Sequence, residues 1–345
     1  MTRRHGQIVR ALEDIGHQVV LFPLARADGS AYQRENGGGA SPPANRPVKM
    51  LSDKNHAALL NVVRERRPSL IILTHPDATD FVPSAVQQGV RSIVATHNLE
   101  GSLQMKRGMG RSLINQASVI AAEALYLHKA DRVWTVSPYD EHYYRAWYRL
   151  RNIRTIYSGM DAQADLASTG VAETVLFVGT FSYRPNIDAA RHLVERLMPQ
   201  VRRQVPYARL ILAGSRPTEE VLRWQSESVA VLPDLPDIRT AYEAAAVVAA
   251  PIRMGGGSNF KVIEAMAYGK PVVISARAAR GLYPLDGEAC VGANDEDLIR
   301  GIVQLLIRPS EGLALGKKAH DYVSRHYGSQ QLRETLQSEL AMIQS

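Results

Sequence analysis

Short apolar runs alternate with amphipathic stretches along nearly the whole sequence. The runs are made of Val, Ile, Leu and Ala without strict polar alternation, which is typical of parallel strands covered by helices on both faces. They predict strands at residues 17–22, 69–74, 92–96, 133–136 and 155–157 in the first half, and at 174–178, 209–213, 229–232, 247–250, 271–274 and 289–291 in the second. The pattern therefore predicts an α/β protein with parallel sheets.

The amphipathic stretches between these runs predict the helices. We expect them at residues 6–14, 53–66, 84–89, about 104–129 and 139–148, then at 187–204, 218–225, 238–244, 261–268 and 295–307, with two more before the last residue. Gly and Pro dominate residues 36–47, which therefore predict a loop. Residues 162–172 are small and polar and predict a linker.

The length of 345 residues suits two domains. Two α/β halves joined at such a linker predict a cleft between them, and ligands bind such folds at the carboxyl ends of the strands. The single cysteine, Cys290, excludes an intramolecular disulfide framework and a cysteine-rich metal site, and it suits a reducing compartment. No run of 18 apolar residues and no apolar leader segment occurs, so we expect a cytoplasmic protein without a membrane span.

The charge is uneven, because residues 1–168 carry a net charge of +6 and the remainder +1. Such an excess suggests an anionic partner for the first half: a phosphorylated acceptor, an anionic membrane surface or nucleic acid. A basic but otherwise ordinary surface is the alternative. No nucleic-acid-binding module is recognisable, so we expect no nucleic-acid partner.

The segment at 251–269, PIRMGGGSNFKVIEAMAYG, carries the clearest chemical signal. Three glycines follow a strand and precede a helix that Ser258 or Asn259 can cap. Glycines let the backbone approach a ligand, and the helix N-terminus favours phosphate. Glu264 follows about one turn later, where its carboxylate can accept hydrogen bonds from two vicinal hydroxyls. The alternative is a tight turn with Glu264 solvated on the helix.

Residues 264–272, Glu-Ala-Met-Ala-Tyr-Gly-Lys-Pro-Val, resemble the donor-binding helix of the GT-B glycosyltransferases of family 4, the glycosyl transferases group 1. The similarity extends from about residue 5 to residue 330 through 177–186, 210–214, 235–237 and, more loosely, 97–100, 130–131, 136–137 and 158–161. The resemblance implies a GT-B fold: two Rossmann-like doubly wound domains facing a cleft. It implies an N-terminal acceptor-side domain at 1–165, a nucleotide-sugar-binding domain at 166–328, and a C-terminal helix at 329–345 that packs back on the first domain.

The resemblance also implies roles for particular residues. Glu264 would bind the ribose of a nucleotide-sugar, and Arg184 and Lys261 would be cationic partners of its diphosphate. His97 would face the donor sugar or the acceptor. The backbone facing the diphosphate and sugar would be that of Gly255, Gly256, Gly257, Ser258 and Asn259. Structural alternatives stay open: a surface lysine at 261, an arginine that pairs near a helix start at 184, and a strand-end histidine bonded to backbone at 97.

The activity implied is that of a retaining glycosyltransferase, which moves a sugar from a nucleotide diphosphate-sugar to an acceptor hydroxyl. The acceptor would be a saccharide or lipid-linked intermediate in polysaccharide, glycolipid or related glycoconjugate biosynthesis. No DxD-like pair, HExxH motif or Cys/His cluster occurs, so we expect neither a metal nor a cofactor beyond the donor. The alternative is a non-catalytic GT-B subunit that binds a nucleotide or sugar, or a partner.

Two departures from the family pattern favour that alternative. Gly256 stands where many relatives have a glutamate that contacts the transferred sugar. The family also has a strand and a glycine-rich loop before the helix that here begins near residue 7, so the first domain is expected to lack its first strand. Peripheral membrane contact through the basic half is a further expectation, with candidates at Arg3, Arg4, Arg10, Arg64, Arg66, Arg67, Lys106, Arg107 and Arg111.

Overall fold

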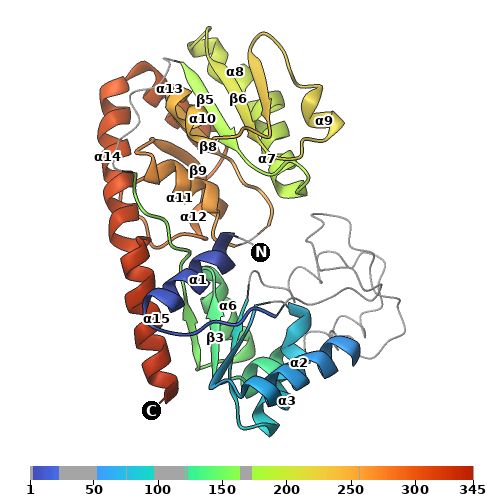
Figure 1. The fold of residues 1–345 in the computed structure, drawn as a ribbon. Coiled ribbons are helices and arrows are strands. Elements are labelled where there is room, and N and C mark those ends of the chain that lie inside the picture. The colour runs from blue at the N-terminus through green and yellow to red at the C-terminus, as the bar shows by residue number, and fades with distance from the viewer. Residues whose placement is uncertain are drawn as a thin grey trace. The chain divides into compact units, whose positions relative to one another are not determined.

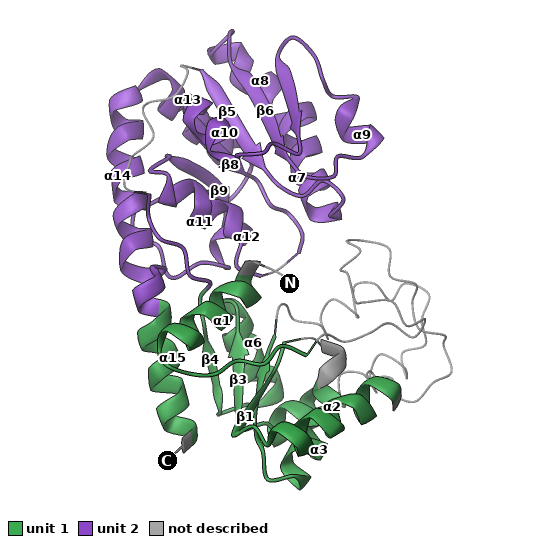
Figure 2. Cartoon of the chain, in the orientation of Figure 1, with its two compact units in different colours: residues 1–157, 332–345 green, residues 158–331 purple. Residues whose placement is uncertain are grey.

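The computed structural model describes residues 3–22, 53–74, 76–96, 121, 123–163, 173–255 and 257–344. The chain forms two compact units (Figure 2). Unit 1 contains Met1–Tyr157 and Leu332–Ser345, and unit 2 contains Ser158–Gln331. The predicted loop at 36–47 and most of the predicted linker at 162–172 lie outside the described residues.

Unit 1 has a four-stranded parallel sheet in the order β1-β2-β3-β4 among its described residues. The strands are β1 (Leu70–Leu73), β2 (Arg91–Ala95), β3 (Arg132–Thr135) and β4 (Ile153–Thr155). The helices are α1 (Arg3–Asp14), α2 (Asp53–Arg66), η1 (Pro76–Phe81), α3 (Val82–Gln87), α6 (Pro138–Tyr148) and α15 (Ser329–Gln344). Residues 123–129, inside the helix predicted at about 104–129, are helical as well.

Hydrophobic clusters cover both faces of this sheet. Side chains of α1 and α15, among them Leu12 and Leu336, pack with Ile93 of β2 on one face (Figure 1). On the other face, Val94 packs with residues of α2, α3 and α6, among them Tyr144. Because successive residues of a strand point to opposite faces, both must be apolar here. This explains why the strands show no polar alternation in the sequence.

The strand predicted at residues 17–22 is wrong. The structure describes these residues without strand pairing. The apolar pattern reflects burial, because Val19 and Phe22 pack against the two clusters of unit 1. A strand requires a neighbour for its backbone hydrogen bonds, and an apolar run by itself does not supply one.

Arg4 was a candidate for membrane contact, but its buried side chain is not available for such a contact. Its side chain enters the sheet from α1, and its guanidinium donates hydrogen bonds to the backbone oxygens of Thr96 (2.9 Å), Thr135 (3.2 Å) and Ile156 (3.2 Å). These carbonyls lie at the carboxyl ends of β2, β3 and β4. Burial lowers the pKa of Arg4 to about 10. Arg4 therefore supports the fold of unit 1 by satisfying backbone oxygens.

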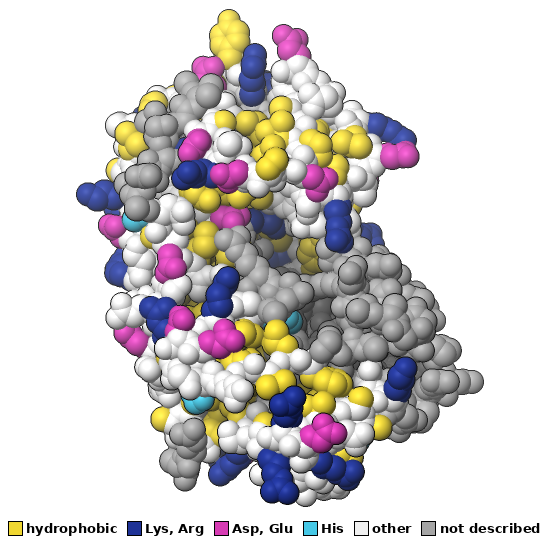
Figure 3. All heavy atoms as spheres, in the orientation of Figure 1, with side chains coloured by type: hydrophobic (Ala, Val, Ile, Leu, Met, Phe, Trp, Pro, Cys, Tyr) yellow, Lys and Arg dark blue, Asp and Glu magenta, His cyan; other side chains and the backbone are white. Residues whose placement is uncertain are grey.

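The structure describes only some of the remaining basic candidates. Arg10, Arg64, Arg66 and Arg67 are exposed, whereas Lys106, Arg107 and Arg111 lie outside the described residues. On the face drawn in Figure 3, Lys and Arg side chains are interspersed with Asp and Glu.

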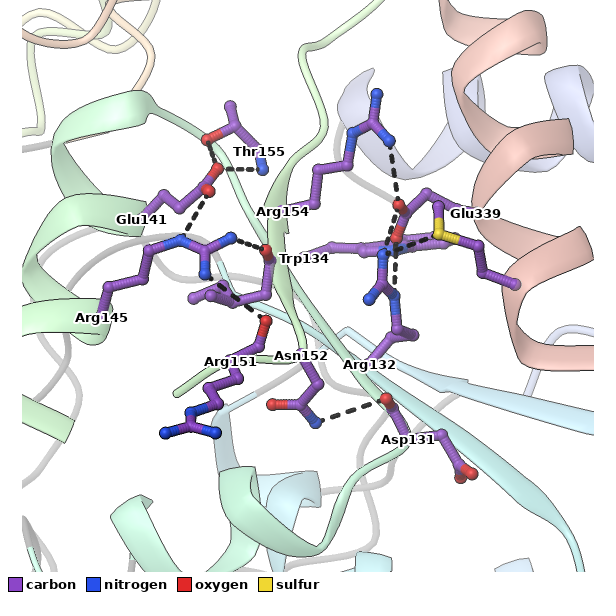
Figure 4. Close-up of polar contacts among 12 residues, drawn as sticks. Asp131, Arg132, Trp134, Glu141, Arg145, Arg151, Asn152, Arg154, Thr155 and Glu339 are labelled. Atoms are coloured by element: carbon purple, nitrogen blue, oxygen red, sulfur yellow. Dashed lines mark hydrogen bonds and ion pairs between the residues drawn. The ribbon is translucent and has the colours of Figure 1, made fainter. Parts of the chain in front are cut away.

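Glu339 attaches α15 to the sheet of unit 1 (Figure 4). Its fully buried carboxylate accepts hydrogen bonds from Arg132 (Nε, 3.1 Å; Nη2, 2.6 Å) and from the Trp134 indole N–H (3.0 Å). Arg154 contributes a longer contact of 3.4 Å. A buried carboxylate is tolerated when cations and donors surround it in this way.

Unit 2 has a six-stranded parallel sheet in the order β10-β9-β8-β5-β6-β7. The strands are β5 (Thr174–Val178), β6 (Arg209–Gly214), β7 (Val229–Pro233), β8 (Val247–Ala250), β9 (Val272–Ser275) and β10 (Cys290–Gly292). The strand order reverses between β5 and β8, as in doubly wound folds. The carboxyl ends of these two strands therefore form the place where such folds bind ligands.

The helices of unit 2 cover this sheet (Figure 1). They are α7 (Arg184–His192), the π-helical turn η2 (Leu193–Leu197), α8 (Met198–Gln204), α9 (Glu219–Leu222), α10 (Arg239–Ala244), α11 (Phe260–Ala267), α12 (Ala276–Ala279), α13 (Asp295–Ile307) and α14 (Pro309–His326). The single helix predicted at 187–204 is therefore α7, η2 and α8 in succession. The short α12 was not predicted from the sequence, and it anchors the glycine loop of the candidate site.

Candidate functional site

Two glycines lie at the carboxyl ends of β5 and β6, where the neighbouring backbone and α7 approach closely. Gly214 has a φ of +156°, and a Cβ atom on it would lie 1.7 Å from the backbone oxygen of Gly179. The Gly179 amide in turn donates to the Ala213 oxygen at 3.0 Å. A Cβ on Gly179 would lie 2.9 Å from Nδ2 of Asn186. Glycine at both positions therefore brings the first turn of α7 against the ends of the sheet.

The loop after β8 carries the glycines singled out in the sequence. Gly255 and Gly257 have φ values of +89° and +87°, in the left-handed region that favours glycine. A Cβ on Gly255 would lie 3.2 Å from Cγ of Pro185. The loop therefore lies against the start of α7. Gly256, between these two glycines, lies outside the described residues.

The segment around α12 holds this loop in place. Ser275 Oγ donates to the Ile252 oxygen at 2.6 Å, and Arg277 lies 3.4 Å from the Gly255 oxygen. Asn259 Nδ2 donates to the Ala278 oxygen at 2.9 Å. These three contacts fix the backbone of the loop.

The predicted cap of α11 is not formed by Asn259. This residue has a φ of +42° and stands at the N-cap position, but its side chain makes no capping hydrogen bond. The side chain is instead engaged with Ala278, as described above. The N-terminus of α11 therefore has no side-chain cap, and a helix N-terminus carries a partial positive charge that favours an anion.

Lys261 lies in the first turn of α11 and reaches α7. Its Nζ donates to Oδ1 of Asn186 at 2.6 Å and lies 5.5 Å from the centre of the Phe177 ring. Burial lowers the pKa of Lys261 to about 8. The ammonium group is therefore held in place at the carboxyl end of β5, and an anionic partner would stabilise its charge.

Glu264 lies one turn after Lys261 and is buried. Its Oε2 accepts a hydrogen bond from the Tyr242 hydroxyl at 3.0 Å. The Tyr242 ring stacks on Tyr268, with ring centres 4.7 Å apart and planes inclined by 22°. This support fixes the position of the carboxylate, which is a hydrogen-bond acceptor.

In the part of the chain that it describes, the structure shows no such contacts for the other predicted site residues. Arg184 is the first residue of α7 and is exposed, and it forms no ion pair with a described residue. Ser258 is half-buried in the loop before α11. His97 lies outside the described residues. The structure therefore brings together Lys261, Glu264, the described part of the glycine loop and the start of α7.

Sequence reasoning missed the residues that support this site. Asn186 and Tyr242 hold Lys261 and Glu264, and Arg253 forms a bidentate pair with Asp188 at 2.7 and 3.1 Å. The only signal was position, since Asn186 and Arg253 both follow closely on a strand end. Tyr242 had no signal, because it lies 22 residues from its partner along the chain.

Other features of the described residues lie apart from this site. A groove of about 740 Å³ runs between α8 and α13, lined by residues such as Arg203 and Arg300. Within the described ranges, no group of three or more His, Cys, Asp or Glu side chains is placed to hold a metal ion. None of the described helices is long and apolar enough to cross a bilayer.

Comparison with known families identifies the chain. The profile described as Glycosyl transferases group 1 matches residues 172–308, and the profile described as Glycosyltransferase Family 4 matches residues 2–164. The chain belongs to the family 4-like, group 1 glycosyltransferases. No curated protein sequence matches it. The two matches together cover most of both units of this glycosyltransferase.

Solved structures share the GT-B fold of this glycosyltransferase. Sucrose-phosphate synthase from Thermosynechococcus elongatus is 20% identical with a TM-score of 0.70, over 98% of this chain and 92% of that one. HepE from Anabaena, solved with UDP and glucose, is 14% identical with a TM-score of 0.66, over 87% and 84%. TarM from S. aureus is 14% identical with a TM-score of 0.67 over 84% of this chain, which spans 58% of the TarM chain. The two Rossmann-like parallel-sheet units therefore form a GT-B fold, as predicted.

Proposed function

We propose that this glycosyltransferase is a retaining enzyme that transfers a sugar from a nucleotide diphosphate-sugar to an acceptor hydroxyl. The observation that carries the proposal is the arrangement on α11. An uncapped helix N-terminus, the Lys261 ammonium and the buried Glu264 carboxylate follow one another within two turns. Such a site offers positive charge to a diphosphate and a fixed acceptor to vicinal hydroxyls.

In this proposal the chain stabilises the leaving group. The diphosphate gains negative charge as the sugar departs, and the Lys261 ammonium and the partial positive charge of the α11 N-terminus would face that charge. Each such contact lowers the activation barrier by roughly 2–4 kcal/mol. Glu264 would orient the nucleotide through its ribose. Arg184 would add a second cation, and His97 would contact the donor sugar or acceptor.

The finer features are also proposals. We expect no metal or cofactor beyond the donor, and a saccharide or lipid-linked acceptor in polysaccharide, glycolipid or related biosynthesis. Support for a nucleotide-sugar donor comes from HepE, which was solved with UDP-glucose at 16% identity and a TM-score of 0.64. We further propose a cytoplasmic enzyme with peripheral membrane contact.

Thermal stability in the presence of UDP-, GDP- and ADP-sugars tests the donor site. A ligand at 100 times its Kd should stabilise the protein by roughly 2.7 kcal/mol. Glu264→Ala should abolish that shift, whereas Glu288→Ala, which changes a carboxylate elsewhere in unit 2, should leave it intact. If no nucleotide-sugar moves the melting temperature, the donor site is wrong.

Product analysis separates an enzyme from the non-catalytic alternative. The nucleotide that binds best should be released as its diphosphate while the sugar moves to an acceptor or to water. The anomeric configuration of the product, measured by NMR, should match that of the donor. Binding without any release of sugar would instead indicate a subunit that binds a nucleotide-sugar.

A further inference from the structure

Helix α6 of unit 1 carries a line of three aromatic side chains, of which Tyr139 and Trp147 are exposed and Tyr143 is half-buried against the core. Tyr139, Tyr143 and Trp147 are spaced four residues apart, so they lie along one face of the helix. The rings of Tyr143 and Trp147 stack with centres 6.0 Å apart and planes inclined by 27°. Trp147 is nevertheless 74% exposed. Moving a large aromatic ring out of water lowers the free energy, so this face favours contact with another molecule or surface.

The adjoining face of α6 is fixed to the fold. The hydroxyls of Tyr144 and Tyr148 donate to the two carboxylate oxygens of the buried Glu123, each at 2.9 Å. Both tyrosines belong to the core of unit 1. The helix therefore cannot rotate to bury Trp147 without breaking these bonds. The aromatic line is a preformed surface.

The C-terminal end of α6 lies against the end of the helical segment at 123–129. His128 forms a hydrogen bond through Nε2 with the Tyr148 oxygen at 2.7 Å. Asn152 Nδ2 donates to the Ala130 oxygen at 2.5 Å. These contacts place residues 128–130 beside residues 148–152, next to Trp147.

Three cations are exposed in these adjoining segments: Lys129, Arg149 and Arg151. None of them forms an ion pair with a residue that the structure describes. Figure 4 shows the Arg151 guanidinium pointing away from the polar groups drawn around it. The half-buried carboxylates of Asp131 and Glu141 are already paired with other arginines at 2.9 and 3.0 Å. Lys129, Arg149 and Arg151 therefore stay without an ion-pair partner among the described residues.

We propose that these residues form a docking surface for an anionic lipid bilayer. The surface, called the α6 patch, consists of Tyr143, Trp147, Lys129, Arg149 and Arg151. Aromatic side chains settle at the level of the lipid headgroups, and Lys and Arg beside them attract anionic lipids. The proposal deepens the membrane contact included in the proposed function by naming the surface and the lipid charge that it requires.

A glycan is the other partner that exposed aromatic rings bind. Stacking on a neutral sugar requires the rings but not the cations. Three unpaired cations around an exposed tryptophan instead complement a negative surface. The charge of the α6 patch therefore favours the bilayer.

Vesicle co-sedimentation without nucleotide tests the proposal, so failure of the donor site would not affect the result. The full chain should bind vesicles of phosphatidylglycerol and phosphatidylcholine in equal parts, and bind pure phosphatidylcholine much more weakly. Lys129→Gln, Arg149→Asn and Arg151→Gln together should weaken binding on the order of 100-fold, at about fivefold per cation. Asparagine is chosen at position 149 because that residue has a φ of +55°.

The matched control removes three exposed cations of unit 2, by Arg196→Gln, Lys317→Gln and Lys318→Gln. It should bind mixed vesicles like the unaltered protein. Tryptophan emission should shift to shorter wavelength on mixed vesicles, and Trp147→Phe should remove that shift. Equal loss in both triple variants, equal binding to neutral vesicles, or an emission shift caused by soluble polysaccharide in place of lipid would overturn the proposal.

Discussion

The titration of Lys261 gives a quantitative test of the donor site. Burial lowers the pKa of Lys261 to about 8, so the free protein loses this charge between pH 7 and pH 9. A group with that pKa is about nine-tenths protonated at pH 7 and about one-tenth protonated at pH 9. If only the ammonium form binds the diphosphate, nucleotide affinity should fall about tenfold over this range. The phosphates add no titration of their own there, because their last pKa is near 6.

Calorimetric titration with the nucleoside diphosphate that gives the largest thermal shift measures this slope. Lys261→Arg should bind with no slope between pH 7 and pH 9, since a guanidinium stays charged. Lys261→Met should bind weakly at both pH values, with a loss of roughly 1.5–3 kcal/mol at pH 7 for a charged hydrogen bond. Lys261→Arg keeps the positive charge at position 261 but removes its titration, whereas Lys261→Met removes the charge at every pH.

The Lys261 variants are needed because a second lysine, Lys270, also has a lowered pKa. Burial also lowers the pKa of Lys270 to about 8, but its Nζ donates to the Ala245 oxygen at 2.9 Å and is fully enclosed. Titration of Lys270 would change the stability of unit 2 in every variant alike. An affinity that stays constant in the unaltered protein, or a slope that persists in Lys261→Arg, would refute the assignment of Lys261 to the diphosphate.

Three further predictions concern the stability of the units. Burial raises the pKa of Asp140 to about 6 from 3.8, so stability is lost as the pH rises from about 4 to about 6, where the carboxyl ionises in the unfolded chain before it ionises in the folded one. Asp140→Asn should therefore raise the stability of unit 1 at pH 7 by on the order of 2–3 kcal/mol and have no effect below pH 4 in thermal melts. Glu339→Leu should cost unit 1 about 3–5 kcal/mol in urea unfolding, because it leaves the half-buried Arg132 guanidinium and the buried Trp134 indole N–H without their acceptor. The half-exposed Arg154→Gln should cost less than about 1 kcal/mol, and equal costs would contradict the burial argument. Gly214→Ala should prevent unit 2 from folding, because its Cβ would overlap a carbonyl oxygen. Gly287→Ala, at a φ of +83° with open space around it, should cost roughly 1–2 kcal/mol, and circular dichroism with limited proteolysis should separate the two.

Both sheets were predictable because burial on two faces leaves a local trace. Strands β5 and β8 have the predicted bounds, since each is a continuous apolar run. The helices α2 and α13 also have the predicted bounds. The apolar run at residues 17–22 was misleading, because local hydrophobicity reports burial but not the presence of a neighbouring strand.

The candidate site was predictable where its residues are close together in the sequence. The glycines, Lys261 and Glu264 lie within ten residues of one another, so one segment displays them. The partners that fix them come from other elements. Asn186 is 75 residues from Lys261, and the α12 contacts to the glycine loop were not foreseen.

The sequence by itself determined where strands, glycine turns and the helix of the family motif occur, because backbone geometry and side-chain burial act over a few residues. Only the tertiary structure decided which side chains meet. It buried Arg4 among three strand ends, used Asn259 to hold α12 in place of capping α11, and left Trp147 in solvent beside unpaired cations. The physical reason is that hydrogen bonding and desolvation depend on groups brought together by sheet order and helix packing, which sequence distance does not record.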